Sequence, residues 1–318
     1  MFYLLVASSL SYLAQQFEEK SFLSWMRSTN QIFSGDEYHL RFGIYLTNLR
    51  LVQQHNSQSG RKFRIGLNKF ACLTRNEYRA LLGINPGEKL HHANINQKRN
   101  VEVPESLDWR EKGAVCPIQD QGGCGSCWAF SAIAGAEGAW FIQTNELVKF
   151  SEQNLVDCVT ECSGCGGGLR DSAYQHVIDN QQGQFMREED YPYTAVEGDC
   201  QFDQSKGVGE IHGYYSVAVG SEDDLLESVT KYGPTSVGID ASSFNFQLYT
   251  DGIYDQSDDC LAFLINHGVV CVGFGTEDEV DYFIVRNSWG PGWGESGYVR
   301  FIRHINICGI ATRAYSVY

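Results

Sequence analysis

Residues 119–131 read QDQGGCGSCWAFS, and this stretch carries the strongest structural and chemical signal in the chain. It leads into residues 126–143, SCWAFSAIAGAEGAWFIQ, which hold a single charged residue and predict a buried helix. Alanines recur along that helix and would let neighbouring backbone approach closely. Cys127 falls at the start of the helix, where the aligned N–H groups favour a thiolate. The stretch therefore predicts a central helix with a reactive cysteine in its first turn.

The paired cysteines of this stretch allow three chemical interpretations. Cys124 and Cys127 could form a redox dithiol, but the short βαβ context of such motifs is missing. Together with Cys162 and Cys165 they could bind zinc, although 34 residues separate the two pairs. In the third interpretation Cys127 is a nucleophile and Cys124 belongs to a structural disulfide. The third is favoured.

The charge of the chain is divided between its two ends. Residues 1–102 carry 13 Lys and Arg against 7 Asp and Glu, a net charge of +6. Residues 103–318 carry 11 against 32, a net charge of −21. The acidic body argues against nucleic acid as a partner. A basic front segment should be attracted to it, and acidification should weaken that attraction and favour self-activation.

The amino terminus and the cysteine content both predict export. Residues 1–14, MFYLLVASSLSYLA, are apolar but too short to span a bilayer. We interpret residues 1–16 as a signal peptide, with a buried N-terminal helix as the alternative. The 11 cysteines indicate an oxidising compartment, and their odd number leaves at least one outside intramolecular disulfides.

The remaining pattern predicts an α+β protein of two or three structural units. Apolar residues recur at helical spacing from 18 to 58, and residues 63–70 suggest a short strand. Thr74 and Glu77 predict a capping box at the start of a helix over residues 74–82. Residues 83–100 resemble an exposed linker. Beyond residue 210 the runs 236–240, 268–273, 281–286 and 297–302 predict strands.

Two further motifs lie near the carboxyl end. Asn266-His267-Gly268 falls on an apolar strand, and residues 286–290 read RNSWG, followed by GWG at residues 292–294. With CGSCW at residues 124–128, these motifs make the chain resemble a papain-family peptidase of the cathepsin L type over nearly its whole length. His267 follows Cys127 by 140 residues, within the roughly 130–150 typical of that family.

The resemblance implies a precursor organisation and an activity. It implies an inhibitory propeptide over residues 17–102 and a peptidase domain over residues 103–318. The implied fold is two-lobed, with a helical N-terminal lobe and a β-barrel-like C-terminal lobe, preceded by the helical propeptide. The implied activity is that of a cysteine endopeptidase, which hydrolyses peptide bonds through an acyl-enzyme intermediate after the propeptide is removed. A catalytically silent binding homologue of the same fold is the alternative.

The resemblance also implies a role for each site residue. Cys127 is the nucleophile, and His267 is its base and later the acid that protonates the leaving amine. Asn287 holds the imidazole tautomer, and Trp289 shields that hydrogen bond from solvent. Gln121 contributes to the oxyanion hole.

The implied environment follows from the same family. Polypeptide substrates, the chain's own propeptide and cystatin-like inhibitors are the expected partners. No cofactor or metal ion is expected, and neither is a nucleic acid or a membrane span. The protein is expected to be a monomer that is secreted or held in a lysosome-like or endosome-like vacuole.

Six cysteines match disulfides of the family. The implied bridges are Cys124–Cys165, Cys158–Cys200 and Cys260–Cys308. Cys116 and Cys162 remain as a hypothetical extra bridge, and Cys271 is expected to be a small buried hydrophobic residue.

The front segment resembles a cathepsin L-like propeptide in one helical stripe, although the stripe is also what a stable helix alone would need. The stripe comprises Glu37, Arg41, Tyr45, Asn48, Val52 and Asn56. Further on, Cys72 replaces an acidic residue of the family pattern, which puts pH sensing at that position in doubt.

Substrate selection is expected at the pocket that receives the side chain before the scissile residue. The resemblance implies that Gly167, Gly168, Leu169, Arg170, Ile265, Trp289 and Arg313 bind substrate. Two arginines converging on one pocket would favour an acidic substrate side chain. In the alternative, one or both arginines bend out to solvent.

Overall fold

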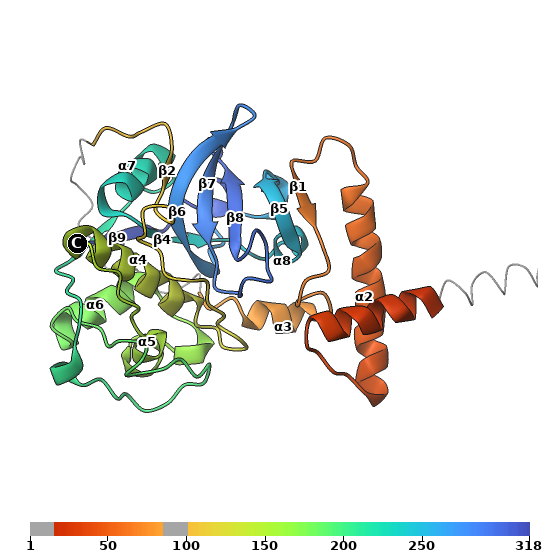
Figure 1. The fold of residues 1–318 in the computed structure, drawn as a ribbon, viewed down its shortest axis with the longest axis horizontal. Helices are drawn as coiled ribbons and strands as arrows, with labels where there is room; N and C mark the ends of the chain where they lie inside the picture. The colour runs from red at the N-terminus through yellow and green to blue at the C-terminus, as the bar shows by residue number, and fades with distance from the viewer. Residues whose placement is uncertain (1–15, 85–100) are drawn as a thin grey trace, which may run out of the picture.

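The computed structural model describes residues 16–84 and 101–318 (Figure 1). The predicted signal peptide, up to residue 15, and the predicted linker, from residue 85 to residue 100, lie outside the described residues. Within the described part of the chain, no helix is long and apolar enough to cross a bilayer.

Residues 103–318, the predicted peptidase domain, form a helical lobe and a sheet lobe, as predicted for an α+β protein (Figure 1). The helical lobe contains α4 (Cys127–Thr144), α5 (Glu152–Cys158), η1 (Gly164–Gly166) and α6 (Arg170–Asn180). The remaining helices are η2 (Gln204–Lys206), α7 (Glu222–Tyr232), α8 (Phe244–Gln247), η3 (Ser257–Asp259) and η4 (Ile307–Gly309). The strands of this domain are β2 (Leu107–Asp108), β3 (Tyr214–Ser216), β4 (Thr235–Ile239), β5 (Tyr249–Tyr254), β6 (His267–Glu277), β7 (Val280–Arg286), β8 (Tyr298–Ile302) and β9 (Ala314–Val317).

One sheet organises the second lobe. Its strands follow the order β1-β5-β8-β7-β6-β4-β9-β3, with β2 paired to β6. The first of these, β1 (Phe63–Ile65), comes from the front segment. All pairings are antiparallel except β5 with β8. In the described residues the pairings form an open path, and no pairing joins β1 to β3 to close a barrel. Because β6 and β7 are antiparallel, the start of β6 at His267 lies near the end of β7 at Arg286. Strand β6 packs against α4.

Helix α4 lies between the lobes because its sequence is small and apolar. Every residue from Cys127 to Ala139 is buried. A Cβ atom at Gly138 would lie 2.4 Å from the ring of Pro234, which is closer than packed atoms approach. The helix predicted over residues 126–143 is confirmed, but it is buried only up to Ala139, and its last turn is half-buried or exposed. Small side chains let the buried part pack on both lobes.

The front segment folds into two helices, a short strand and a third helix (Figure 1). A helix over residues 16–28 is followed by α2 (Gly35–Asn56), so the helical pattern predicted from 18 to 58 is interrupted at residues 29–34. The strand β1 covers only Phe63–Ile65, shorter than predicted. The helix α3 (Arg75–Ala80) has the predicted capping box between Thr74 and Glu77.

The polar stripe on α2 does more than stabilise a helix. Arg41 donates to the carbonyl oxygen of Cys72 at 2.8 Å and pairs with Glu77 at 2.5 Å. Asn48 donates to the carbonyl oxygen of Ala71 at 2.7 Å. Asn56 accepts from the N–H of Ile65 and donates to its carbonyl oxygen. The stripe therefore holds the chain that follows α2 in place.

The front segment docks on the sheet lobe mainly through uncharged groups. Strand β1 extends the sheet beside β5. Gln247 accepts from Asn68 through its carbonyl oxygen and donates to the carbonyl oxygen of Phe70. Tyr78 donates to the carbonyl oxygen of Ala241 at 2.7 Å.

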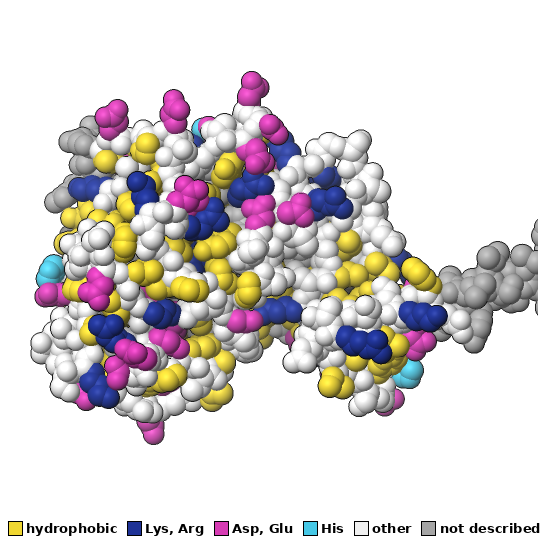
Figure 2. All heavy atoms as spheres, in the orientation of Figure 1, with side chains coloured by type: hydrophobic (Ala, Val, Ile, Leu, Met, Phe, Trp, Pro, Cys, Tyr) yellow, Lys and Arg dark blue, Asp and Glu magenta, His cyan; other side chains and the backbone are white. Residues whose placement is uncertain are grey.

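Charge contributes little to this docking. Across residues 16–84 and 101–318, the single salt bridge between front segment and body joins Lys69 to Asp120 at 2.5 Å. Figure 2 shows both signs of charge interspersed over the visible face, without a block of one sign where the two parts meet. The contacts do not support the sequence-based expectation that opposite net charges hold the propeptide, because neutral hydrogen bonds and apolar packing make up most of the interface.

The Arg41–Glu77 pair predicts a specific pH dependence of propeptide stability. Hydrogen bonding to Arg41 lowers the pKa of Glu77 from 4.5 to about 2. The stabilisation is therefore fully present above about pH 4.5 and is lost as the pH falls through about 2. We expect Glu77→Gln to lower the melting temperature of the precursor by roughly 2 °C, equally at pH 7 and pH 5.

Thermal unfolding followed by circular dichroism measures this effect. Glu37→Gln is the matched control, because Glu37 is 55% exposed and lies 3.4 Å from Arg41. An equal effect of the two substitutions, or an effect of Glu77→Gln that is already gone at pH 5, would contradict the assignment.

Candidate active site

Cys127 lies at the start of α4 in a dry environment. Its side chain is fully buried. The sulfur accepts the N–H of Gly83 at 3.2 Å and that of Gly268 at 3.4 Å. A Cβ atom at Gly268 would lie 2.9 Å from the carbonyl oxygen of Cys127. The absence of a side chain at Gly268 thus lets the start of β6 reach the start of α4.

His267 is the first residue of β6 and is held by two side chains that follow β7. Its Nε2 lies 2.8 Å from Oδ1 of Asn287, whose oxygen also accepts the N–H of Ser288 at 2.8 Å. The amide oxygen is the acceptor, so Nε2 carries the proton and Nδ1 is left for proton exchange. The indole ring of Trp289 stacks on the imidazole at 4.6 Å between ring centroids.

Gln121 presents its amide to the same cleft. Its Oε1 accepts from Ser288 at 2.7 Å, which orients the amide so that Nε2 points the other way. Nε2 donates to the carbonyl oxygens of Leu81 and Cys124, each at 2.9 Å. Leu81 belongs to the front segment, so Gln121 already binds a peptide carbonyl oxygen from a chain that lies in the cleft.

Residues 81–84 of the front segment follow α3 without regular secondary structure and pass directly over Cys127. The carbonyl oxygen of Gly83 accepts the N–H of Gly168 at 2.9 Å, and Ile84 donates its N–H to Asn266 at 3.1 Å. The group that faces the thiol is the N–H of Gly83. A thiolate attacks a carbonyl carbon, and an amide N–H offers none, so this orientation occupies the site without presenting a cleavable bond to Cys127.

Burial beneath residues 81–84 shifts the Cys127 thiol and the His267 imidazole toward their neutral forms. It raises the pKa of the Cys127 thiol, against hydrogen bonds from Gly268 and Gly83 that lower it. It lowers the pKa of His267 from 6.5 to about 4, although the hydrogen bond to Asn287 raises it. Thiol and neutral imidazole are therefore the favoured forms near neutral pH while residues 81–84 are in place.

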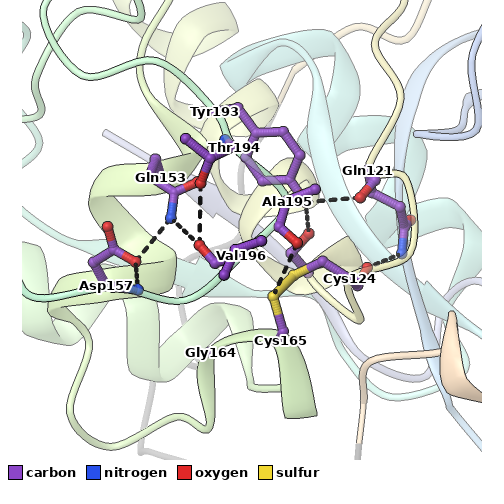
Figure 3. Close-up of a disulfide and its surroundings, with 12 residues drawn as sticks. Gln121, Cys124, Gln153, Asp157, Gly164, Cys165, Tyr193, Thr194, Ala195 and Val196 are labelled. Carbon is purple, nitrogen blue, oxygen red and sulfur yellow. Dashed lines mark hydrogen bonds between the residues drawn. A yellow bond between two sulfur atoms is a disulfide. The ribbon is translucent and has the colours of Figure 1, made fainter.

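The three disulfides are those that the family resemblance implied: Cys124–Cys165, Cys158–Cys200 and Cys260–Cys308. The first supports the turn before α4 (Figure 3). Tyr193 packs beside it, donating to the carbonyl oxygen of Gln121 at 2.8 Å, and its hydroxyl lies 2.6 Å from that of Ser126. This cross-linked turn fixes Gln121 relative to the first residue of α4.

The hypothetical Cys116–Cys162 bridge is wrong. Neither residue belongs to a disulfide. The thiol of Cys116 lies near Glu137, whereas Cys162 accepts the N–H of Leu169 at 3.4 Å. Cys271 is fully buried in the apolar core, as expected.

The predicted substrate-binding residues meet beside Cys127. Gly167 adopts a φ of +118°, which glycine tolerates, and a Cβ there would lie 2.8 Å from the carbonyl oxygen of Gly83. Leu169 and Ile265 belong to one cluster of buried apolar side chains, together with Ile84 of the front segment. Asn266 completes this wall through its carbonyl oxygen.

Arg170 is turned inward, against the alternative that it bends out to solvent. Its side chain is buried, and Nη2 donates to the carbonyl oxygen of Arg313 at 2.8 Å. Its guanidinium lies 5.6 Å from the ring centroid of Tyr315. Nε and Nη1 have no hydrogen-bond partner among the described residues. Burial lowers the pKa of Arg170.

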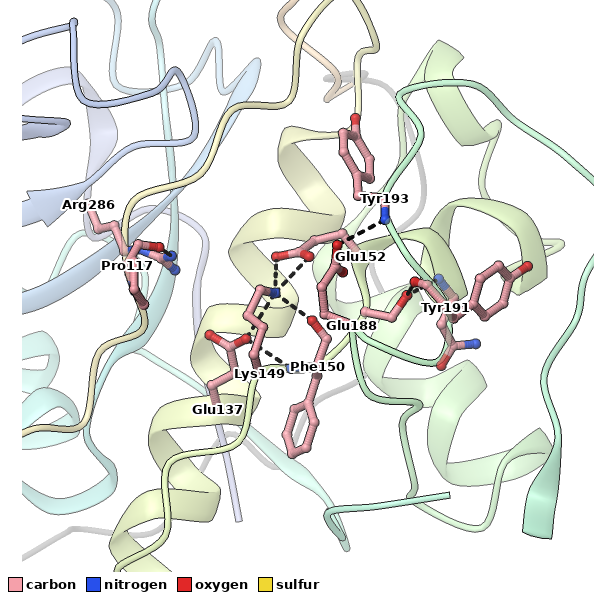
Figure 4. Close-up of polar contacts among 11 residues, drawn as sticks. Pro117, Glu137, Lys149, Phe150, Glu152, Glu188, Tyr191, Tyr193 and Arg286 are labelled. Atoms are coloured by element: carbon pink, nitrogen blue, oxygen red, sulfur yellow. Dashed lines mark hydrogen bonds and ion pairs between the residues drawn. The ribbon is translucent and has the colours of Figure 1, made fainter. Parts of the chain in front are cut away.

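A buried charge cluster behind the site was not predicted (Figure 4). Lys149 pairs with Glu137 of α4 at 3.0 Å and with Glu152 of α5 at 2.7 Å. Burial raises the pKa of Glu152 to about 7, and Lys149 opposes this shift. Glu188 accepts the N–H of Tyr193 at 2.9 Å. Lys149 lies in a polar stretch without periodicity, so no sequence signal pointed to this cluster.

Because residues 81–84 pass over Cys127, we predict that Gly83 controls access to this thiol. A Cβ at Gly83 would lie 1.7 Å from the carbonyl oxygen of Gly125, which is backbone and cannot move aside. We expect Gly83→Ala to raise the rate at which iodoacetamide labels Cys127 in the unprocessed precursor at pH 7 by about tenfold or more.

Gly43→Ala on α2 is the matched control, because a Cβ there meets nothing within 4 Å. It should leave the labelling rate unchanged. The labelling rates are measured by peptide mass spectrometry. Equal rates for both variants would show that the position of residues 81–84 over Cys127 does not depend on this close approach.

Comparisons with known proteins agree with this geometry. Residues 103–318 match the papain family cysteine protease domain, and residues 22–78 match the cathepsin propeptide inhibitor domain (I29). The oryzain beta chain of Oryza sativa subsp. japonica is 45% identical over 292 residues, covering 88% of this chain and 61% of that protein. The chain thus spans about three fifths of that curated relative.

Animal relatives are similar over most of both chains. A cathepsin L-like proteinase of Fasciola hepatica is 40% identical over 299 residues, covering 91% of this chain and 90% of that protein. The structure of digestive procathepsin L 3 from the Tenebrio molitor larval midgut has a TM-score of 0.85 at 34% identity, covering 94% of this chain and 98% of that one. This chain belongs to the papain family of cysteine proteases and carries a cathepsin-type propeptide domain.

Proposed function

We propose that the chain is the inactive precursor of a cysteine endopeptidase, with Cys127 as nucleophile and His267 as its acid and base. The observation that carries the proposal is the position of the His267 imidazole. Asn287 holds this ring, and Trp289 covers it. The next residue, Gly268, donates its N–H to the sulfur of Cys127. A helix start favours the thiolate, and a neighbouring imidazolium adds to that effect once water replaces residues 81–84 of the propeptide.

The proposed reaction uses each group in turn. The thiolate adds to the substrate carbonyl carbon, and Gln121 donates to the developing oxyanion. Its present hydrogen bond to the carbonyl oxygen of Leu81 supports this role. His267 then gives its proton to the leaving amine, which releases the first product and leaves a thioester on Cys127. Water, deprotonated by His267, hydrolyses the thioester and regenerates the thiolate.

The expected setting of the enzyme follows from the same proposal. Three disulfides fit folding in an oxidising compartment, secreted or endolysosomal. Polypeptides are the substrates, the propeptide is an intramolecular inhibitor, and cystatin-like proteins are proposed as inhibitors in trans.

Active-site titration tests the function. After acid treatment, a thiol-reactive peptidyl epoxide should label Cys127 stoichiometrically and abolish hydrolysis of a fluorogenic peptide. Cys127→Ser should remove both signals. Cys271→Ser is the control, because burial raises the pKa of that thiol to about 12 and keeps it unreactive. Propeptide removal without labelling or hydrolysis would favour a catalytically silent homologue.

We also propose that the pocket beside Leu169 accepts an acidic substrate side chain. Arg170 is buried, and two of its nitrogens find no hydrogen-bond partner among the described residues. A buried guanidinium is stabilised when a carboxylate binds it. Burial raises the pKa of Tyr315 to about 12, and the charges of Arg170 and Arg313 oppose this shift. Two positive charges therefore lie close to one hydroxyl at this pocket. Among the described residues, the propeptide contributes the apolar side chain of Ile84 to the same cluster as Leu169.

A peptide library tests this specificity. Wild-type enzyme should cleave peptides with Glu before the scissile residue at least as fast as those with Leu. Arg170→Met should reduce kcat/KM for the Glu peptides by about tenfold or more and leave the Leu peptides nearly unchanged. Lys231→Met, at an exposed position on α7, is the control. Selection of apolar side chains by the wild type, with no gain for Glu, would refute the acidic pocket.

A further inference from the structure

A small cavity lies between the lobes, lined by Gly268 and Asn287 among others. Its volume is about 10 Å³. Its walls come from the segment before the cysteine turn, from α4, from β6, and from the end of β7 with the two residues that follow it. The lining residues are Gln119, Phe130, Ser131, Gly268, Val269, Val270, Arg286, Asn287 and Ser288. A space of this size holds about one water molecule.

Three polar atoms on residues of this wall lack a partner. They are Oε1 of Gln119, Nε of Arg286 and Nδ2 of Asn287, each shielded from solvent and without a hydrogen bond among the described residues. Arg286 and Asn287 are 5% and 3% exposed. A buried polar atom without a partner costs about 1–3 kcal/mol. Three such atoms around one cavity would therefore destabilise the fold unless a bound molecule forms hydrogen bonds with them.

Each of the three residues is also held by a hydrogen bond elsewhere. Oδ1 of Asn287 accepts from His267 and from the N–H of Ser288. Arg286 donates through Nη2 to the carbonyl oxygen of Pro117 at 2.8 Å. The carbonyl oxygen of Gln119 accepts the N–H of Gly290 at 2.9 Å. These bonds fix the three residues around the cavity, and two donors and one acceptor on these lining residues remain without a partner among the described residues.

We propose that this cavity is a binding site for one structural water molecule, and that Gln119 is a positioning residue for Asn287 through it. The water accepts hydrogen bonds from Nδ2 of Asn287 and Nε of Arg286 and donates one to Oε1 of Gln119. This set satisfies all three atoms, and three hydrogen bonds are typical of buried water.

The consequence concerns the orientation of the Asn287 amide. Its oxygen and nitrogen are nearly equal in shape, so their hydrogen bonds decide which one faces His267. A water that accepts from Nδ2 keeps Oδ1 on the imidazole. The hydrogen bond from His267 to Oδ1 raises the pKa of His267, so the water helps to retain the imidazolium. This step rests on the proposed function.

Crystallography of the full-length precursor tests the site itself. At a resolution near 1.2 Å, we expect electron density for one water within hydrogen-bond distance of Gln119, Arg286 and Asn287. The same density should be absent from Gln119→Met, whose side chain has a similar length but no strong acceptor. An empty cavity in the wild type, or a direct Gln119–Asn287 hydrogen bond that closes it, would overturn the proposal.

Kinetics of the acid-activated enzyme tests the positioning role. For Gln119→Met, we expect kcat to fall by about five- to tenfold with little change in KM. The alkaline limb of the kcat/KM profile should move to lower pH, because a weaker hydrogen bond to Asn287 lowers the pKa of His267. Gln119→Glu keeps an acceptor and should restore the limb to the wild-type pH or above. Rates are normalised to the titrated thiol, which removes losses due to misfolding.

The two proposals fail in different ways. A Gln119→Met enzyme with an unchanged alkaline limb and unchanged kcat refutes the positioning role, while the peptidase activity stands. A wild-type protein that neither titrates nor hydrolyses peptides refutes the proposed function. The electron density still decides whether the water is bound.

Discussion

The close contact between the first turn of α4 and the start of β6 is the constraint on which the rest of the structure depends. Gly268 lies so near Cys127 that its N–H reaches the sulfur and a Cβ would strike the carbonyl oxygen of Cys127. Because backbone meets backbone, the side chains of Cys127 and His267 have little freedom relative to each other. Such restricted geometry is what makes a bimolecular proton transfer effectively intramolecular.

Glycines also allow the propeptide backbone to approach the backbone of the body closely. Gly83 passes over Gly125 and Gly167 at distances that no Cβ would allow. Residues 81–84 exclude water from Cys127 and His267 and shift both toward neutral forms. Inhibition therefore has a steric part and an electrostatic part, and the electrostatic part comes from desolvation. Docking depends on hydrogen bonds and aromatic packing, such as the edge contacts of Phe70 and Tyr78 with Trp289.

Predictions from the sequence succeeded where chemistry demands particular residue types at particular spacings. The cleft contains Cys127, His267, Asn287 and Gln121 together, and the implied disulfides are present. Predictions failed where a polar side chain has several possible partners. Periodicity indicated that the polar stripe of α2 is helical, but its bonds to residues 65–77 depend on how the chain returns. The Cys116–Cys162 pairing failed for the same reason.

The sequence by itself determined the family and the α+β class, and it predicted the thiol chemistry and the division into a propeptide and a peptidase. These follow from local patterns and from motifs of fixed spacing. Only the tertiary structure decided that Arg170 is buried beside Arg313, that Lys149 lies between two buried glutamates, and that an amide N–H meets the sulfur of Cys127. Each of these depends on which groups water cannot reach. Burial of a polar group is set by segments distant in the chain, and no local pattern encodes it.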